Sequence, residues 1–369
     1  MALRSMVLRS MVLRWLRVVC IPVLCVGAAV PLTRGQSAPS PDAPPVSNVP
    51  VDSSSTEETP RETLKVTSNL VSEYFTVRDK KNALIPFLTK NDCNVFEDKQ
   101  PQKLTSFVAE ANQPLTLGIL IDTSGSQMNV LPLEQQSASA FLKRILREKD
   151  QAFLVSFDVG VNLEQDYTNN VRELDRAISK VEINTAAGGG SAGVPGIGQG
   201  PVPTQGAPKG TLLYDAVNEV STHKIRSESG RKALILLTDG EDEGSVTKPK
   251  EAIAAAENAN AIIYVILIAD RGFYGYGNFG MGYSGDMQMR SLTEATGGRV
   301  INVGNNGKKL EDAFDQIEQE LRTQYVAQYV PGNKAMDGKF RKVDIFCKDQ
   351  DGDLKVQARK GYFAVGDED

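Results

Sequence analysis

The sequence predicts an α/β protein: a doubly wound, mostly parallel sheet flanked by a small β module built from N- and C-terminal segments. Over residues 113–323, apolar runs of strand length alternate with amphipathic helical patterns, which is typical of βαβ units. Short strand-like segments lie on either side, over residues 62–112 and 324–366. The second flank is too small to bury a stable core alone, so we expect it to join the first and the two to sandwich together beside the α/β domain.

The first element of the central domain is the apolar run Leu115–Asp122. An uninterrupted run of this kind predicts a strand buried on both faces of a parallel sheet. The same reasoning predicts four more strands: Ala152–Phe157, Lys232–Thr238, Ala261–Ala269 and Arg299–Val303. Residues 161–165 are expected to form a hairpin with Ala152–Phe157. The intervening helical patterns are Leu131–Glu148, Val171–Val181, Thr211–Ile225, Lys248–Asn260, Met287–Thr296 and Lys308–Gln324.

The flanking segments alternate polar and apolar residues between turn signals. Asp79–Asn82, Asp98–Pro101 and the pair Asp351-Gly352 are typical of tight turns between strands. The expected strands are Tyr74–Arg78, Ala83–Ile85, Asn94–Glu97, Lys103–Val108, Tyr325–Val330, Phe340–Cys347 and Leu354–Ala358.

Residues 1–35 have the composition of a signal peptide. Four arginines precede an apolar run, Val18–Leu32, that is short for a membrane span and is interrupted by Pro22. Residues 36–61 are rich in Pro and Ser and predict a disordered linker. We therefore expect an exported protein, periplasmic, secreted or associated with the cell envelope. It would touch a membrane only through the N-terminal segment, if that segment remains uncleaved as an anchor.

The net charge and the cysteine content bear on two questions: whether the protein binds nucleic acid, and whether it contains a disulfide. Without the five arginines of residues 1–35, the formal net charge of −5 becomes −10, which argues against binding to nucleic acid. Removal of the signal would leave Cys93 and Cys347. In an oxidising compartment this pair can bridge, but two isolated cysteines can equally be small buried residues, and the sequence leaves both open.

Oxygen-bearing side chains follow the ends of predicted elements at three places. Asp122, Ser124 and Ser126 end the first strand in an Asp-x-Ser-x-Ser pattern; Thr211 starts a predicted helix, and Asp239 follows a later strand. The carboxyl ends of parallel strands meet at one edge of a sheet, where such folds bind ligands. Hard oxygen donors suit Mg²⁺ or a similar cation, so we expect a metal site at this edge.

This arrangement resembles the von Willebrand factor type A (VWA) family and its metal-ion-dependent adhesion site (MIDAS). The resemblance implies that the hydroxyls of Ser124, Ser126 and Thr211 contact the ion, while Asp122 and Asp239 act directly or through water. It also implies Mg²⁺, or Mn²⁺ or Ca²⁺, with one position left open for an exposed Asp or Glu of a protein partner. The protein would then be a binding module and not an enzyme.

The flanking segments resemble a narrower group, the acidobacterial-type secreted VWFA-related proteins. The matching pieces are Leu88–Asp92, Phe96–Gln102, Gln324–Tyr329 and Ala358–Tyr362, with Lys99 and Cys93 departing from that group's usual residues.

Two rival functions stay open. One is a metal-free structural module in an envelope assembly. The other is a metal-dependent hydrolase, which is disfavoured because an aspartate nucleophile would need a second acid where Ser124 stands. In addition, His223 is the only histidine of the chain, so general acid–base catalysis by histidine has a single candidate.

Overall fold

A computed structural model describes residues 70–109, 113–183, 210–268, 284–350 and 352–364 of the chain. The predicted signal peptide (1–35) and linker (36–61) lie outside these residues. Within the described part, no helix combines the length and the apolar character needed to cross a membrane.

A six-stranded sheet forms the centre of the α/β domain, in the order β10-β9-β8-β5-β6-β7. Every neighbouring pair is parallel except β6 and β7, which form the expected antiparallel hairpin. This confirms the predicted fold class. The strands are β5 (Leu115–Asp122), β6 (Gln151–Phe157), β7 (Val161–Thr168), β8 (Arg231–Thr238), β9 (Ala261–Leu267) and β10 (Val300–Asn302).

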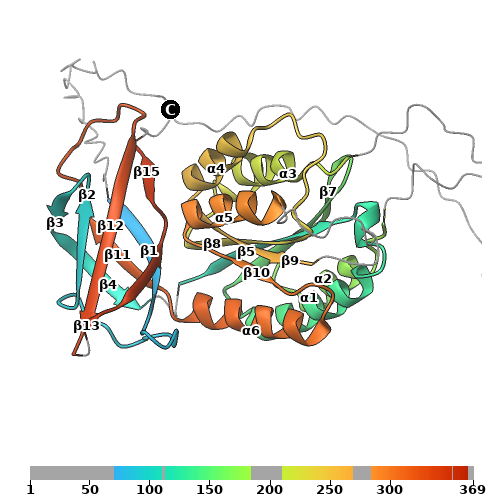
Figure 1. Cartoon of the computed structure of the whole chain (residues 1–369), viewed down its shortest axis with the longest axis horizontal. Coiled ribbons are helices and arrows are strands. Elements are labelled where there is room, and N and C mark those ends of the chain that lie inside the picture. Colours follow the sequence, from blue (N-terminus) through green and yellow to red (C-terminus); the bar gives the residue numbers. More distant parts are fainter. Residues whose placement is uncertain (1–69, 110–112, 184–209, 269–283, 351, 365–369) are drawn as a thin grey trace, which may run out of the picture. The chain divides into compact units, whose positions relative to one another are not determined.

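Helices cover both faces of this sheet (Figure 1), which is why its central strands are apolar throughout. Along β8, Ala233, Ile235 and Leu237 pack on one side, and Leu234 and Leu236 on the other. The first side is covered by α1 (Leu131–Ile145), α2 (Val171–Ile178) and α6 (Gly307–Arg322). The second is covered by α3 (Leu213–Glu219), its π-helical continuation η2 (Val220–Ile225), α4 (Pro249–Asn258) and α5 (Ser284–Thr296).

Helix α1 is shorter than its hydrophobic pattern predicts. It ends at Ile145 because Leu146 adopts an extended conformation. The carboxylate of Asp150 then accepts hydrogen bonds from the backbone N–H of Arg147, at 3.0 Å, and of Leu115, at 2.9 Å. These bonds offer the backbone an alternative to another helical turn, and they fix the start of the central strand.

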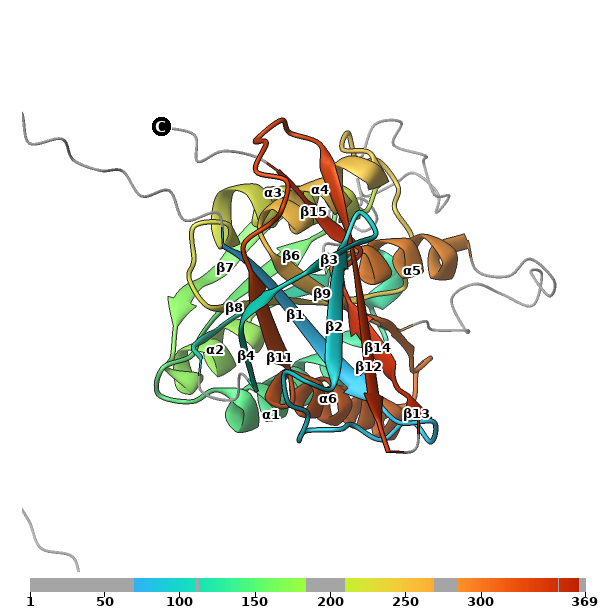
Figure 2. The same ribbon diagram turned by 90° about the vertical axis from the view of Figure 1, so that its left-hand side faces the viewer.

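The flanking segments form two antiparallel sheets that face one another (Figure 2). A single apolar core lies between them, with members from both sheets such as Phe75, Val95, Tyr329 and Ile345. One sheet contains β1 (Val71–Arg78), β4 (Leu104–Ala109), β11 (Tyr325–Tyr329) and β14 (Lys355–Ala358). The other contains β2 (Cys93–Glu97), β3 (Gln100–Gln102), β12 (Phe340–Asp349), β13 (Gly352–Asp353) and β15 (Gly361–Phe363).

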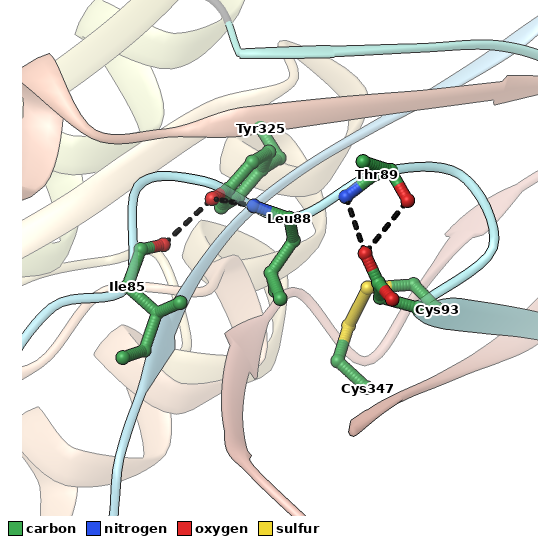
Figure 3. Close-up of a disulfide and its surroundings, with 7 residues drawn as sticks. Ile85, Leu88, Thr89, Cys93, Tyr325 and Cys347 are labelled. Carbon is green, nitrogen blue, oxygen red and sulfur yellow. Dashed lines mark hydrogen bonds between the residues drawn. A yellow bond between two sulfur atoms is a disulfide. The ribbon is translucent and has the colours of Figure 1, made fainter. Parts of the chain in front are cut away.

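Cys93 and Cys347 form a disulfide inside this β module (Figure 3). They occupy opposite positions in the β2–β12 register, and both are buried. The adjoining loop is held by the Tyr325 hydroxyl, which donates to the carbonyl of Ile85 at 2.7 Å and accepts from the N–H of Leu88 at 2.9 Å. The structure thus selects the bridged alternative that the sequence left open.

Polar contacts of two buried glutamates lie where the β module meets the α/β domain. Within the β module, the guanidinium of Arg359 donates to both carboxylate oxygens of the buried Glu73 of β1, and it also donates to the side-chain oxygen of Asn260 in the α/β domain. Arg78 of β1 and Arg299 pair with Glu320 of α6, which is likewise fully buried. Removing one partner of such a pair would leave an uncompensated buried charge, so we expect the loss of either partner to destabilise the fold.

We predict that replacing both cysteines by alanine lowers the free energy of unfolding by about 2–5 kcal/mol, because the bridge constrains the unfolded chain. Urea unfolding with and without a reductant measures the loss. The Cys93→Ala/Cys347→Ala variant is its own control, since the reductant should leave it unaffected. Equal stability of oxidised and reduced wild type would contradict the prediction.

Candidate metal centre

The strand order places the candidate site at a topological switch point. From β5 the chain runs to β6 on one side, and β8 later joins β5 on the other. Open α/β sheets bind ligands in the crevice outside the carboxyl ends of the strands at such a point. Asp122 is the last residue of β5, and Asp239 directly follows β8, so these two predicted site residues flank the crevice.

Asp122 is fully buried, and hydrogen bonds hold both of its carboxylate oxygens. Its Oδ1 accepts from the backbone N–H of Ser124 at 2.9 Å, and its Oδ2 accepts from the hydroxyl of Thr238 at 2.7 Å. The same Thr238 oxygen accepts from the N–H of Gly240 at 3.0 Å. Gly240 has a φ of +83°, a conformation that suits glycine, and it turns the chain directly after Asp239. Asp122 is therefore fixed by the ends of both central strands.

Ser124 and Ser126 place two hydroxyls side by side near the solvent. Their Oγ atoms are 3.0 Å apart, and both residues are half-buried. Ser126 belongs to a short 3₁₀ helix, η1 (Gly125–Gln127), and Ser124 is the extended residue directly before that helix. The predicted ligands thus range from a buried carboxylate to hydroxyls that an external group can approach.

The sequence pattern predicted Thr211 at the start of a helix. In the structure Thr211 lies in the loop just before α3. Its N–H donates to the carbonyl of Glu243 at 3.2 Å, and the N–H of Glu243 donates back to the Thr211 carbonyl at 3.0 Å. A Cβ added to Gly210 would lie 2.3 Å from this Glu243 carbonyl oxygen, so only glycine permits the close approach. The Thr211 loop is thereby paired with the loop that carries Asp239.

Asp158, which sequence analysis missed, connects two of these loops. It follows β6 and is buried. Its Oδ2 accepts from the hydroxyl of Thr123 at 2.8 Å, and its carbonyl accepts from the N–H of Leu212 at 2.7 Å. One residue therefore fixes both the Asp-x-Ser-x-Ser turn and the segment containing Thr211. Its role depends on contacts between distant segments, and its only local signal is a carboxylate at the end of a predicted strand.

Negative charge is concentrated and poorly solvated at this edge of the sheet. Burial, reinforced by the nearby Asp239, raises the pKa of Asp122 to about 7. A third acid, Glu134 of α1, is fully buried, and burial together with Asp122 and Asp239 raises its pKa well above the usual range. Glu134 is not among the site residues that the sequence predicted. Its signal was a carboxylate on the apolar face of the helix, three residues after Leu131 and four before Ala138.

The donor set fits a hard divalent cation. Asp122, Ser124, Ser126, Thr211 and Asp239 offer only carboxylate and hydroxyl oxygens, the ligands that Mg²⁺ accepts readily. A cation would also offset charge that is otherwise costly to bury. Among the described residues, no three His, Cys, Asp or Glu side chains are grouped closely enough to hold a metal by themselves. A cation here would therefore need the hydroxyls and water to complete its shell.

Comparisons with known proteins identify distant structural neighbours only. No protein-family model matches the chain, and no curated protein matches it. The conserved hypothetical protein BatB from Bacteroides thetaiotaomicron aligns at 16% identity and a TM-score of 0.40, over 56% of this chain and 99% of its own. Proximal thread matrix protein 1 from the mussel byssus, with a zinc-occupied MIDAS motif, aligns at 16% identity and a TM-score of 0.43, over 60% and 48%.

The VWA domain of SpRpn10 aligns at 11% identity and a TM-score of 0.37, over 57% of this chain and 95% of its own. Such distant likenesses carry no information about the ion, partner or activity of this chain. The resemblance to the acidobacterial-type secreted proteins stays a prediction.

We predict that Asp122 makes the metal-free protein less stable as pH rises. Its pKa is about 7 in the folded protein, against 3.8 for an unperturbed side chain. The folded state therefore binds this proton more tightly than the unfolded state. The resulting stabilisation is complete below about pH 4 and is lost as pH rises towards 7, a change on the order of a few kcal/mol.

The measurement is urea unfolding from pH 4 to 8 in EDTA, comparing wild type with Asp122→Asn, which cannot titrate. The stability of wild type relative to the variant should fall across this range. A constant difference would show that Asp122 stays ionised throughout.

Proposed function

We propose that this chain is an exported VWA-type module that binds a protein partner through a divalent cation. Asp122, Ser124, Ser126, Thr211 and Asp239 would hold the ion, and an Asp or Glu of the partner would complete its shell. The module itself would be non-enzymatic.

The observation that supports this proposal most strongly is the gradient of donors at the switch point. Asp122 and Asp239 are buried, while Ser124 and Ser126 are half-exposed. A cation bound by few direct carboxylates and several neutral hydroxyls keeps much of its positive charge. Mg²⁺ also prefers six oxygens and seldom finds them all within one protein. An open position facing solvent would therefore attract an external carboxylate.

Catalysis receives less support from the site. His223 lies in η2, and its side chain is about two-thirds exposed. In the described part of the chain, neither Ser124 nor Ser126 hydrogen-bonds to a histidine or lysine base: the hydroxyls bond to one another, Ser126 also accepts from Gln127, and Ser124 also bonds to the carboxylate of Asp122, a predicted metal ligand. An activated serine nucleophile requires such a base within reach.

The metal-free structural alternative is tested by the melting temperature of the purified protein in EDTA and in Mg²⁺ or Mn²⁺. A ligand at 100 times its dissociation constant stabilises the folded state by about 2.7 kcal/mol. We therefore expect a rise of several degrees in wild type and none in Asp122→Ala. An absent shift in wild type would favour the structural alternative.

Partner binding is tested by capture from an envelope extract with and without EDTA. We predict that capture requires the divalent cation and is abolished by Asp239→Ala. The matched control is Asp344→Ala, which removes an aspartate of β12 that pairs with Lys342 on the β module. EDTA-insensitive capture would count against an ion bridge, and hydrolase activity lost in Asp239→Ala would overturn the binding function.

A further inference from the structure

Glu134 is a buried carboxyl group that the fold does not explain. It lies in the first turn of α1, on the face that packs against the sheet together with Leu131 and Ala138. It is fully buried, and neither of its carboxylate oxygens has a hydrogen-bond partner among the described residues. A buried polar group without a partner costs free energy, and nearly all such groups in folded proteins are satisfied.

The surroundings of Glu134 connect it to the candidate metal centre. Its electrostatic neighbours are Asp122 and Asp239, which end the two central strands. The connecting segment holds another unsatisfied acceptor, the Oε1 of the fully buried Gln127. Three acceptor oxygens at the carboxyl ends of the central strands thus lack donors from the described part of the chain. Bound water is the ordinary source of donors for such groups.

We infer that Glu134 is an outer carboxylate of the metal centre, which accepts a hydrogen bond from a water molecule bound to the divalent cation. This inference rests on the proposed cation. It makes Glu134 a positioning residue that acts on the ion through water, because the three acids are not grouped closely enough for a cage of direct ligands. Mg²⁺ usually retains several waters, and outer partners orient them.

The test measures Mn²⁺ affinity of the purified protein by calorimetry and its melting temperature in EDTA. Glu134→Gln keeps the shape of the side chain and removes its charge, and Glu134→Met replaces it with an apolar chain of similar size. Glu257→Gln is the matched control. Glu257 is also a buried helical acid, and burial raises its pKa to about 7. It lies near Asn260, which directly precedes β9, and therefore at the amino ends of the parallel strands, away from the candidate metal centre.

We expect the dissociation constant for Mn²⁺ to rise at least about 10-fold in both Glu134 variants, as is typical when an outer partner of a metal is lost. The control should bind Mn²⁺ like wild type. In EDTA, Glu134→Met should melt at or above the wild-type temperature, because it removes an unsatisfied buried group. A purely structural role would instead lower the melting temperature and leave the affinity unchanged.

Two negative results are distinguishable. If wild type binds no Mn²⁺, the proposed function fails together with this inference. If wild type binds Mn²⁺ and both Glu134 variants bind it equally well, the cation stands and the role of Glu134 is overturned.

Discussion

The parallel pairing of β5 with β8 is the constraint on which the candidate site depends. The register sets Ile121 opposite Leu237, so the two strands end together. Asp122 then lies within a hydrogen bond, 2.7 Å, of the Thr238 hydroxyl. A slip of one residue would turn Asp122 to the other face of the sheet and separate it from this partner. The long apolar runs therefore do more than form a core, because their alignment assembles the polar residues at the sheet edge.

That alignment concentrates acidic side chains at a place where their burial alone does not stabilise the protein. Asp122, Asp239 and Glu134 are all buried close to the same strand ends. Natural proteins tolerate such local costs mainly at functional sites, where the rest of the fold compensates. Here the compensation comes from the surrounding loops, which are joined by Asp158 and by the paired backbones of Thr211 and Glu243. A rigid frame can hold repelling charges ready for a cation.

The sequence was sufficient for the fold class, because strand and helix periods are local properties, and for placing Asp122 at the end of one strand and Asp239 directly after another. It was insufficient wherever a contact joins distant segments. The Cys93–Cys347 bridge follows from the β2–β12 register, which no local pattern encodes. Asp158 was missed for the same reason. Glu134 was visible as a charge on an apolar helical face, but only its burial and missing partners distinguish it from an ordinary surface glutamate.

The position of β1 also has a mechanical consequence. This strand lies between β11 and β14 and pairs antiparallel with both. Tension applied through the polypeptide before Val71 would pull β1 along its own axis. The inter-strand hydrogen bonds are perpendicular to that axis, so they would be loaded in shear and share the force. Because β11 follows α6 directly, a load on the α/β domain would reach β1 through this same ladder.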